Sequence, residues 1–187
     1  MSSMTAKQEA GSFVVTHEFP AARKVFALVR VALGWIFLWA FLDKTFALGF
    51  ATGRLEDGTI DRSAAWINGG SPTTGFLTFA TKGPFAEFFQ GLAGQAWVDW
   101  LFMIGLLGIG LALILGVFMR IGAVAGAAML FLMYLAVLPP EHNPIVDDHI
   151  VYGLTLIGLM LARMEDVWGL GTWWGRLTFV QRYPILK

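Results

Sequence analysis

The chain has no cysteine, few charged residues and no excess of either charge sign. Without thiols it cannot form disulfides, thiolate-ligated metal sites, cysteine-ligated iron–sulfur clusters or covalently attached haem. Charged residues make up only 14% of the 187 positions, and the formal net charge is +0. A neutral chain has no basic field to recruit nucleic acid, and the sequence has no nucleic-acid-binding motif. We therefore expect no haem, no iron–sulfur cluster and no nucleic-acid partner.

Hydrophobic residues are abundant, at 57% of the chain with a mean hydropathy of +0.66. Soluble domains typically have ~45–50% apolar and ~25% charged residues. The surplus of apolar side chains needs a solvent other than water, so the sequence predicts a membrane protein in contact with lipid. Residues 1–24 lack the basic-then-apolar order of a signal peptide. We interpret them as a retained cytoplasmic segment.

Four apolar runs are long enough to cross ~30 Å of hydrocarbon, which takes ~20 residues of helix. They cover approximately residues 25–42, 97–118, 121–138 and 145–162. Each run is continuous rather than alternating, which favours helices over barrel strands. The predicted fold class is all-α, a polytopic four-transmembrane-helix bundle over residues 25–165. A cytoplasmic interfacial tail over 166–187 follows it.

The distribution of Lys and Arg in the short flanks predicts the orientation of this bundle. Arg23 and Lys24 precede the first run, and Arg120 lies between the second and third. The loop over 139–144 has no basic residue. This pattern places both termini in the cytoplasm of a multi-pass cell-membrane protein, with the long loop over 43–96 outside.

The outer loop over 43–96 is too varied in sequence to be a simple linker. Ser71 and Pro72 are typical of a helix N-cap and first turn. Residues 85–92 have the pattern of a short amphipathic helix, and the phenylalanines of the loop suit a membrane interface. We expect one or two short helices on the outer face of the bundle.

Small residues recur in the second and third runs, at Gly105, Gly108, Gly110, and the pair Gly122 and Gly126. Glycines at such spacings allow helices to approach closely. We favour packing within one chain over a dimer interface, because small residues are used generally at helix contacts in membranes.

Arg30 is the single charge inside the first run, and a charge at the centre of a membrane helix costs at least ~2.5–3.5 kcal/mol. Two interpretations are open: snorkelling to the inner interface, or a buried pairing role. At about 100° per residue, Arg30 and Lys44 share one helix face, ~21 Å apart along the axis. They would mark the ends of an interior groove. Arg30, Lys44 and the aromatic Trp39 are therefore candidate cofactor-binding residues.

The densest polar cluster lies at the start of the fourth run, where Pro144 favours a helix beginning near it. A carboxylate in the first turn is favoured by the helix dipole, which explains one of Asp147 and Asp148. The helix dipole does not explain why two aspartates and His149 occur together at this helix start. Asp148 and Tyr152 share one helix face, and His149 lies on the neighbouring face.

An acid and an imidazole near the membrane surface can accept and pass protons, and two-electron reduction of a quinone takes up two protons. Asp148, His149 and Asp43 are therefore the candidate catalytic residues, with Tyr152 as a further residue for binding a quinone ring. A local ion pair with Lys44 is the simpler explanation for Asp43. A metal site is disfavoured because the sequence has no His-x-x-x-His or Glu-x-x-His pair.

These residues and their order resemble the DoxX/DoxD-like membrane proteins over about residues 25–165. The resemblance lies in the stretch from Arg30 to Lys44, Gly69-Gly70-Ser71-Pro72, Gly110 to Gly116 with Arg120, and Asn143-Pro144 with Asp148-His149. It implies a four-helix membrane subunit. In the DoxD branch this is the large subunit of a thiosulfate:quinone oxidoreductase, which passes electrons from thiosulfate to membrane quinone and has a second, smaller subunit.

Three functions follow as hypotheses. The first is a membrane subunit of a quinone-linked oxidoreductase. The second is a non-catalytic membrane subunit of a larger respiratory or redox complex, which fits the absence of a complete catalytic set. The third, a small transporter, ranks last because the second and third runs lack a polar path through the membrane.

Overall fold

The computed structural model describes residues 20–186, so most of the expected cytoplasmic N-terminal segment lies outside the described residues. The described chain is helical and has no strand, only one isolated bridge between Arg54 and Ile60. The longer helices are α1 (Pro20–Phe46), α3 (Ala96–Leu115), α4 (Met119–Ala136) and α5 (Asp148–Leu161). Short helices are η1 (Arg62–Ala64), η2 (Trp66–Asn68), η3 (Phe76–Ala80), η4 (Gly83–Phe85), α2 (Ala86–Gln90), η5 (Met164–Asp166), α6 (Gly171–Trp174), α7 (Thr178–Arg182) and η6 (Pro184–Leu186).

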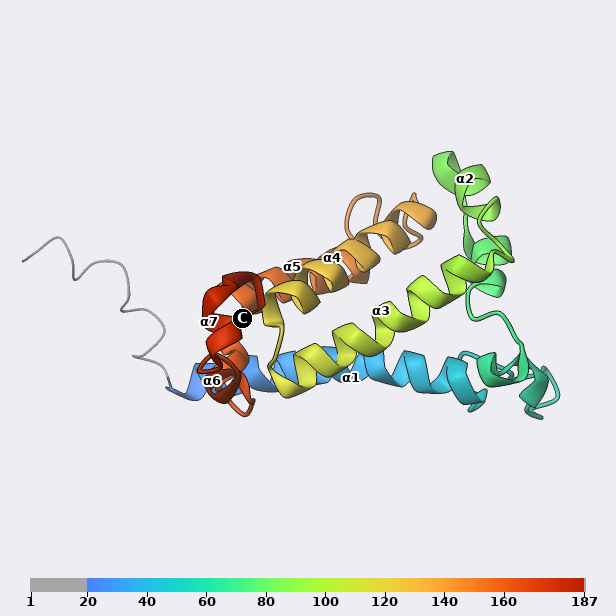
Figure 1. Ribbon diagram of the computed structural model, residues 1–187. Coiled ribbons are helices and arrows are strands. Elements are labelled where there is room, and N and C mark those ends of the chain that lie inside the picture. The colour runs from blue at the N-terminus through green and yellow to red at the C-terminus, as the bar shows by residue number, and fades with distance from the viewer. Residues whose placement is uncertain (1–19, 187) are drawn as a thin grey trace, which may run out of the picture.

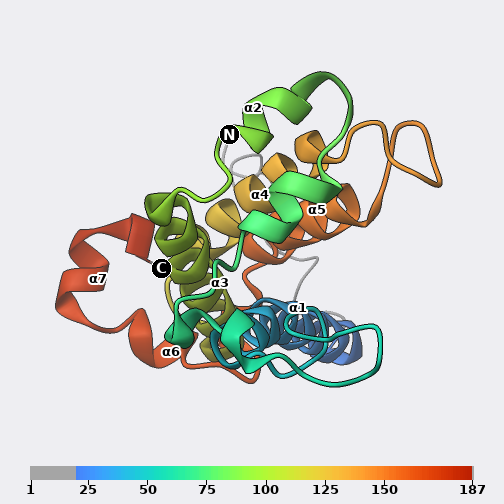
Figure 2. The same cartoon turned by 90° about the vertical axis from the view of Figure 1, so that its right-hand side faces the viewer.

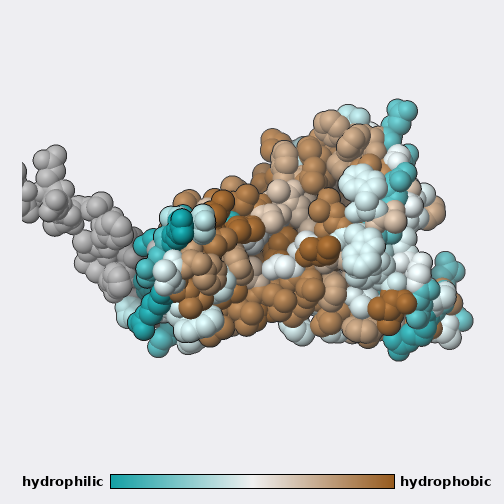
Figure 3. All heavy atoms as spheres, viewed as in Figure 1, coloured by the Kyte–Doolittle hydropathy of each residue, from teal (hydrophilic) through white to brown (hydrophobic). Residues whose placement is uncertain are grey.

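Three helices, α1, α3 and α4, are long and apolar enough to cross a membrane. The all-α prediction and the first three predicted runs are thus confirmed. The fourth run forms α5, which has 14 residues and a rise of about 21 Å, short of the ~30 Å of hydrocarbon. Figure 3 shows a broad apolar surface along the helices, with hydrophilic residues gathered toward the two ends. This distribution is that of a protein embedded in lipid.

The long helices form two antiparallel pairs, α1 with α3 and α4 with α5, and α3 also packs against α4 (Figure 1). In Figure 1 the long helices lie together where α6 and α7 sit, and α1 separates from α3 and from α4 and α5 toward the opposite end; in Figure 2, seen from that opposite end, α1 lies below α4 and α5. We call the end at α6 and α7 the tail end and the opposite end, where residues 47–95 lie, the loop end. The core runs between the pairs, with Phe37, Met103, Leu113 and Leu156 buried in it.

The predicted use of glycine for packing within the chain is confirmed at most positions. A Cβ on Gly110 would lie 2.9 Å from the backbone nitrogen of Leu38, so α1 and α3 touch backbone to backbone there. Gly126 of α4 makes room for a side chain instead, because a Cβ there would lie 2.7 Å from Cδ1 of Leu156 of α5. Gly108 differs, because nothing lies within 4 Å of its Cβ position.

Arg30 joins three parts of the chain at the tail end. Its guanidinium is fully buried and donates hydrogen bonds to the carbonyls of Leu113 (2.9 Å), Val167 (2.9 Å) and Trp168 (3.1 Å). The carbonyls in the last turn of a helix have no partner within that helix, and Leu113 is in the last turn of α3. The cation also complements the negative end of the α3 dipole. The buried interpretation of Arg30 is thus correct, and snorkelling is wrong.

Other helix ends receive their partners from distant segments too. Arg62 donates 3.0 Å hydrogen bonds to the carbonyls of Phe46 and Ala47, where α1 ends. The backbone N–H of Lys82 donates to the carbonyl of Ala136, the last residue of α4. In lipid an unsatisfied backbone group costs several kcal/mol, so these contacts stabilise the helix ends where water is scarce.

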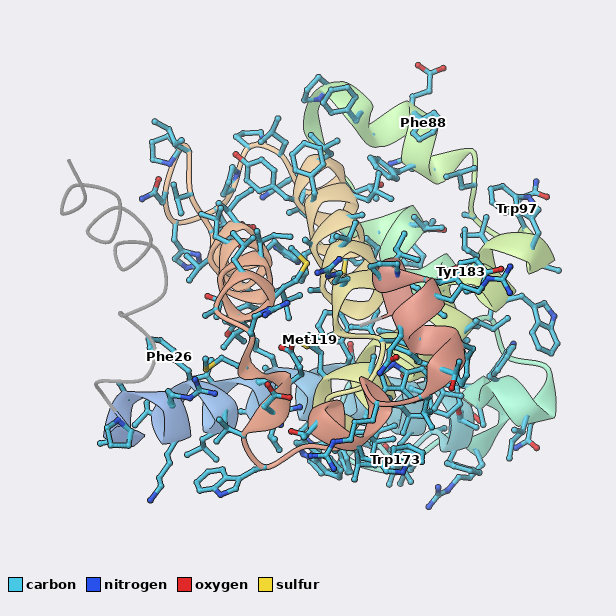
Figure 4. All side chains as sticks on the ribbon, turned by 60° about the vertical axis from the view of Figure 1, so that its left-hand side comes forward. Phe26, Phe88, Trp97, Met119, Trp173 and Tyr183 are labelled. Carbon is cyan, nitrogen blue, oxygen red and sulfur yellow. The ribbon has the colours of Figure 1, made fainter. Side chains whose placement is uncertain are left out.

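The expected short helices of the outer loop are present as η3, η4 and α2. Leu77 and Phe89 from this part of the loop pack against Ala136 at the end of α4, with Val98 of α3 beside them. This small cluster bridges α3 and α4 at the loop end. Phe88 lies on the outside of α2 (Figure 4) and is 65% exposed, available to the membrane interface.

The start of α5 departs from the sequence expectation. Pro144 favours a helix start near it, but the helix begins at Asp148. The Asn143 side chain accepts hydrogen bonds from the N–H groups of Ile145 (2.9 Å) and Val146 (3.1 Å). This local turn competes with the first helical turn, which delays the helix and shortens α5.

The glycine contact between α1 and α3 predicts a difference between two neighbouring substitutions. Gly110→Ala should destabilise the protein by about 1–3 kcal/mol, because the added methyl group meets backbone atoms that cannot move aside cheaply. Gly108→Ala is the matched control and should leave stability equal or higher, because its methyl group enters open space. Unfolding of the purified variants in mixed micelles measures both. Equal stability of the two variants would contradict this packing.

The Arg30 hydrogen bonds predict a second, larger effect. Arg30→Met keeps an unbranched apolar stem but removes the guanidinium, which leaves three carbonyls without their donor, each worth about 1–3 kcal/mol when buried. We expect a loss of at least about 3 kcal/mol in the same unfolding measurement. Arg176→Met, at an exposed position of the tail, is the control and should change stability little.

Candidate functional site

The best-defined polar pair of the loop end lies at the start of α5. Asp147 is the N-cap of this helix, and its Oδ1 accepts a hydrogen bond from the N–H of Ile150 at 3.2 Å. Its other oxygen, Oδ2, lies 2.7 Å from Nδ1 of His149. One carboxylate therefore caps the helix and orients an imidazole at the same time.

Asp148, which the sequence favoured as the acid, has a different position. Its side chain is 67% exposed, and its Oδ1 lies 3.6 Å from the imidazole, beyond hydrogen-bond distance. The side chains of Asp147 and His149 are only 15% and 18% exposed. Asp147 is thus the partner of His149 that sequence reasoning missed. The signal that would have found it is the N-cap preference of Asp, whose carboxylate accepts from the N–H three residues later, here that of Ile150.

A carboxylate held against an imidazole suits proton transfer. A bond from Nδ1–H to Asp147 fixes the tautomer and leaves Nε2 of His149 to accept a proton from outside. The carboxylate also stabilises the imidazolium that forms. Asp147, Asp148 and His149 additionally offer three possible metal-ligand atoms within 4.8 Å of one another. These are common at acidic helix starts and do not by themselves make a metal site.

Asp43 is buried in a structural position. Its two carboxylate oxygens accept hydrogen bonds from the N–H groups of Phe50 (3.2 Å) and Ala51 (2.9 Å). It is 2% exposed. In the described part of the chain it makes no ion pair with Lys44, so the simple local pair suggested by the sequence is not formed. The carboxylate instead holds the loop against the end of α1.

Trp39 and Tyr152 are both half-buried, on different helix pairs. The Trp39 ring packs edge-on against Phe50 with centroids 5.0 Å apart, which adds to the anchoring of the loop at Asp43. Tyr152 packs against the main core from α5, one turn after Asp148. No hydrogen bond joins the Asp43 group to the α5 group among residues 20–186, so the two do not form one polar centre.

Arg30 is likewise not open to a ligand. Its side chain has no exposed surface, and three of its N–H bonds are directed at protein carbonyls. A groove from Arg30 to Lys44 would have to pass the backbone contact between α1 and α3 at Gly110. The structure therefore separates the predicted cofactor-binding residues rather than bringing them together.

Asp99 is a further buried carboxylate that sequence reasoning did not assign to any role. It accepts hydrogen bonds from the hydroxyls of Ser71 (2.9 Å) and Thr73 (2.6 Å). Ser71 in turn accepts from the N–H of Thr74, as the predicted N-cap would. Asp99 thus anchors the start of the loop helices to α3, much as Asp43 anchors residues 50–51 to α1.

At the tail end, Glu165 is a partly buried acid beside Arg30. Its Oε2 has no hydrogen-bond partner in the described chain, and neither has Nε of Arg30. Burial raises the pKa of Glu165 above its ordinary value of 4.5, a backbone hydrogen bond opposes the shift, and Asp166 adds to it. Arg163 and Arg30 also oppose the shift, because they attract the charged carboxylate.

Comparison of the chain with protein-family models, curated proteins and solved structures finds no match. The chemistry is therefore argued from the Asp147–His149 pair, and the family resemblance of the sequence supports only a proposal.

The raised pKa of Glu165 predicts a pH-dependent effect of its replacement. A raised pKa means that the folded chain holds the proton more tightly than the unfolded chain, so this stabilisation is present at low pH and is lost as the pH rises through the folded pKa. Glu165→Gln should therefore raise the unfolding temperature at pH 8, with a difference that shrinks toward pH 4. Glu87→Gln, at an exposed position of α2, should show no such trend. A pH-independent difference for Glu165→Gln would contradict the assignment.

Proposed function

We propose that this protein is a membrane subunit of a quinone-linked oxidoreductase, in which the Asp147–His149 pair transfers protons at the loop end. The observation that carries the proposal is the 2.7 Å contact between Asp147 and Nδ1 of His149. Reduction of a quinone takes up two electrons and two protons, so a reduction site at a membrane surface needs a group that delivers protons from water. His149 is suited to this because one imidazole nitrogen can accept a proton while the other is held by a hydrogen bond.

The surroundings of the pair suit a lipid-soluble substrate. Val151 and Leu154 on α5 are 50% and 69% exposed, so a quinone ring reaching His149 from the membrane would meet an apolar surface. Tyr152 lies on the same helix, and the Tyr134 hydroxyl donates a 2.6 Å hydrogen bond to the carbonyl of Ile145 just before the pair. That contact ties α4 to the loop that carries Asp147.

In this proposal α5 is a fourth crossing, shorter than the other three, and the loop end faces outward with both termini in the cytoplasm. Residues 162–170 continue from α5 around the tail end, where the N–H of Leu170 donates to the carbonyl of Leu115. The absence of basic residues from 139–144 and the presence of Arg120 and Arg163 at the other end support this orientation.

Thiosulfate is the proposed electron donor, on the strength of the resemblance to DoxX/DoxD-like proteins. A dianion needs cations, and Arg54 and Lys82 are exposed in the outer loop, whereas Arg62 is engaged with α1. The chain has no cysteine for a bound redox centre, so electrons would pass directly to quinone or come through a second, smaller subunit.

A non-catalytic subunit of a larger respiratory or redox complex is the second candidate. The buried carboxylates Asp43 and Asp99 both accept hydrogen bonds from the outer loop, which makes a firmly held surface for another chain. In this case Asp147 would only cap α5 and hold the His149 ring in place.

Two substitutions separate these functions. Asp147→Asn keeps a good N-cap but removes the charge that orients His149, and His149→Gln removes the imidazole. We expect thiosulfate-dependent quinone reduction in native membranes or proteoliposomes to fall about 10²-fold or more with either variant, as for loss of a general acid or base. His142→Gln, exposed in the same loop, is the control and should be fully active.

Full turnover by both variants, with the chain still co-purifying with a redox complex, would favour the non-catalytic subunit. No thiosulfate-dependent reduction by the native protein, with or without its co-purifying chains, would exclude the donor. In that case, quinone reduction with other donors would show whether the proton pair is used at all.

A further inference from the structure

A pocket of about 350 Å³ opens at the tail end, between the start of α4 and the end of α5. Its lining combines two arginines, one acid and three apolar side chains: Met119, Arg120, Met160, Leu161, Arg163 and Glu165. The proposed proton pair is at the opposite end of α5, so the pocket belongs to neither candidate function described above.

The two arginines converge on this pocket from different helices. Arg120 is in the first turn of α4, and Arg163 follows the C-cap of α5 in a left-handed backbone conformation (φ 54°). Both are exposed, and across residues 20–186 neither guanidinium makes a hydrogen bond or a close ion pair. The first turn of α4 contains no acidic residue, although a helix start favours negative charge. The positive charge at the pocket is therefore not balanced by a paired acidic side chain, and a bound anion could balance it.

The other walls of the pocket are apolar. Leu161 is 73% exposed at the end of α5, and Met119, the first residue of α4, is buried. Arg120 is the second residue of a membrane-spanning helix, so the pocket lies where the apolar surface of the helices ends. A ligand that fits these features has an anionic head and an apolar chain.

We propose that this pocket binds the phosphate headgroup of an anionic membrane phospholipid, with its acyl chain along Leu161 and the apolar face of α5. Guanidinium groups bind phosphate oxygens in a bidentate manner, and two of them match a phosphodiester. Basic pockets between membrane helices on the cytoplasmic side are sites of this kind.

Glu165 is the one group of the lining that would oppose an anion. Burial raises the pKa of Glu165, and Arg163 attracts its carboxylate, so both effects reduce its repulsion of an anion. The Oε2 of Glu165 is buried and has no hydrogen-bond partner in the described chain.

Lipid titration followed by native mass spectrometry tests the proposal on the full-length, delipidated protein. Phosphatidylglycerol should bind more tightly than phosphatidylcholine with the same acyl chains. Replacing both pocket arginines (R120Q/R163Q) should weaken phosphatidylglycerol binding roughly 10- to 30-fold, as expected for two basic residues near a headgroup. R176Q/R182Q, which removes two exposed arginines of the tail, is the matched control and should change binding less than about twofold.

Three outcomes would overturn the proposal. The first is equal binding of the two lipids, and the second is an equal loss of phosphatidylglycerol affinity in both double variants. The third is displacement of phosphatidylglycerol by inorganic phosphate at similar concentration, which would indicate a site for free phosphate. R120K/R163K keeps both charges but loses the planar fork, so it should bind with intermediate affinity. Circular dichroism of each variant shows whether its helices are intact.

Discussion

The tail end of this protein depends on one buried guanidinium. A charge in a membrane helix is costly, and Arg30 is fully buried in α1. Its cost is offset because it donates to carbonyls of α3 and of the segment after α5. Gly116 and Gly169 make room for it, since a Cβ at either position would meet the guanidinium nitrogens. Arg30 therefore determines how the first and last parts of the membrane domain meet, including the position of Glu165.

The few buried charges share this kind of role. In the described chain Arg30, Asp43 and Asp99 are the buried charged residues, and each bonds to backbone or hydroxyl groups of a segment outside its own helix. In an apolar environment these groups must be satisfied within the protein. The charged residues left over are more informative about function. His149 with Asp147, and Arg120 with Arg163, lie at opposite ends of α5 and are the groups on which the two proposals rest.

Much of the fold could be predicted from sequence because the length of an apolar run depends only on consecutive residues. The first three apolar runs became α1, α3 and α4 with ends shifted by a few residues, and the loop helices follow local turn signals. The fourth run was predicted less well, because the Asn143 side chain captures the N–H groups that would have begun the helix. The candidate site was predicted in its region and in His149, but not in its acid. Asp147 and Asp148 are neighbours in sequence, and only the backbone geometry at the helix start decides which one faces the imidazole.

The sequence by itself determined that the chain has segments long and apolar enough to cross a membrane, which segments are helical, and that its rare charges gather near helix ends, because composition and run length are properties of the chain alone. The tertiary structure decided what each charge does. The carbonyls that Arg30 contacts lie 83 to 138 residues away, and Asp43 is occupied only because the loop folds back onto α1. A hydrogen bond requires its two atoms to be close in space. For segments that are far apart in the sequence, helix packing brings the atoms together, and no local sequence pattern predicts this.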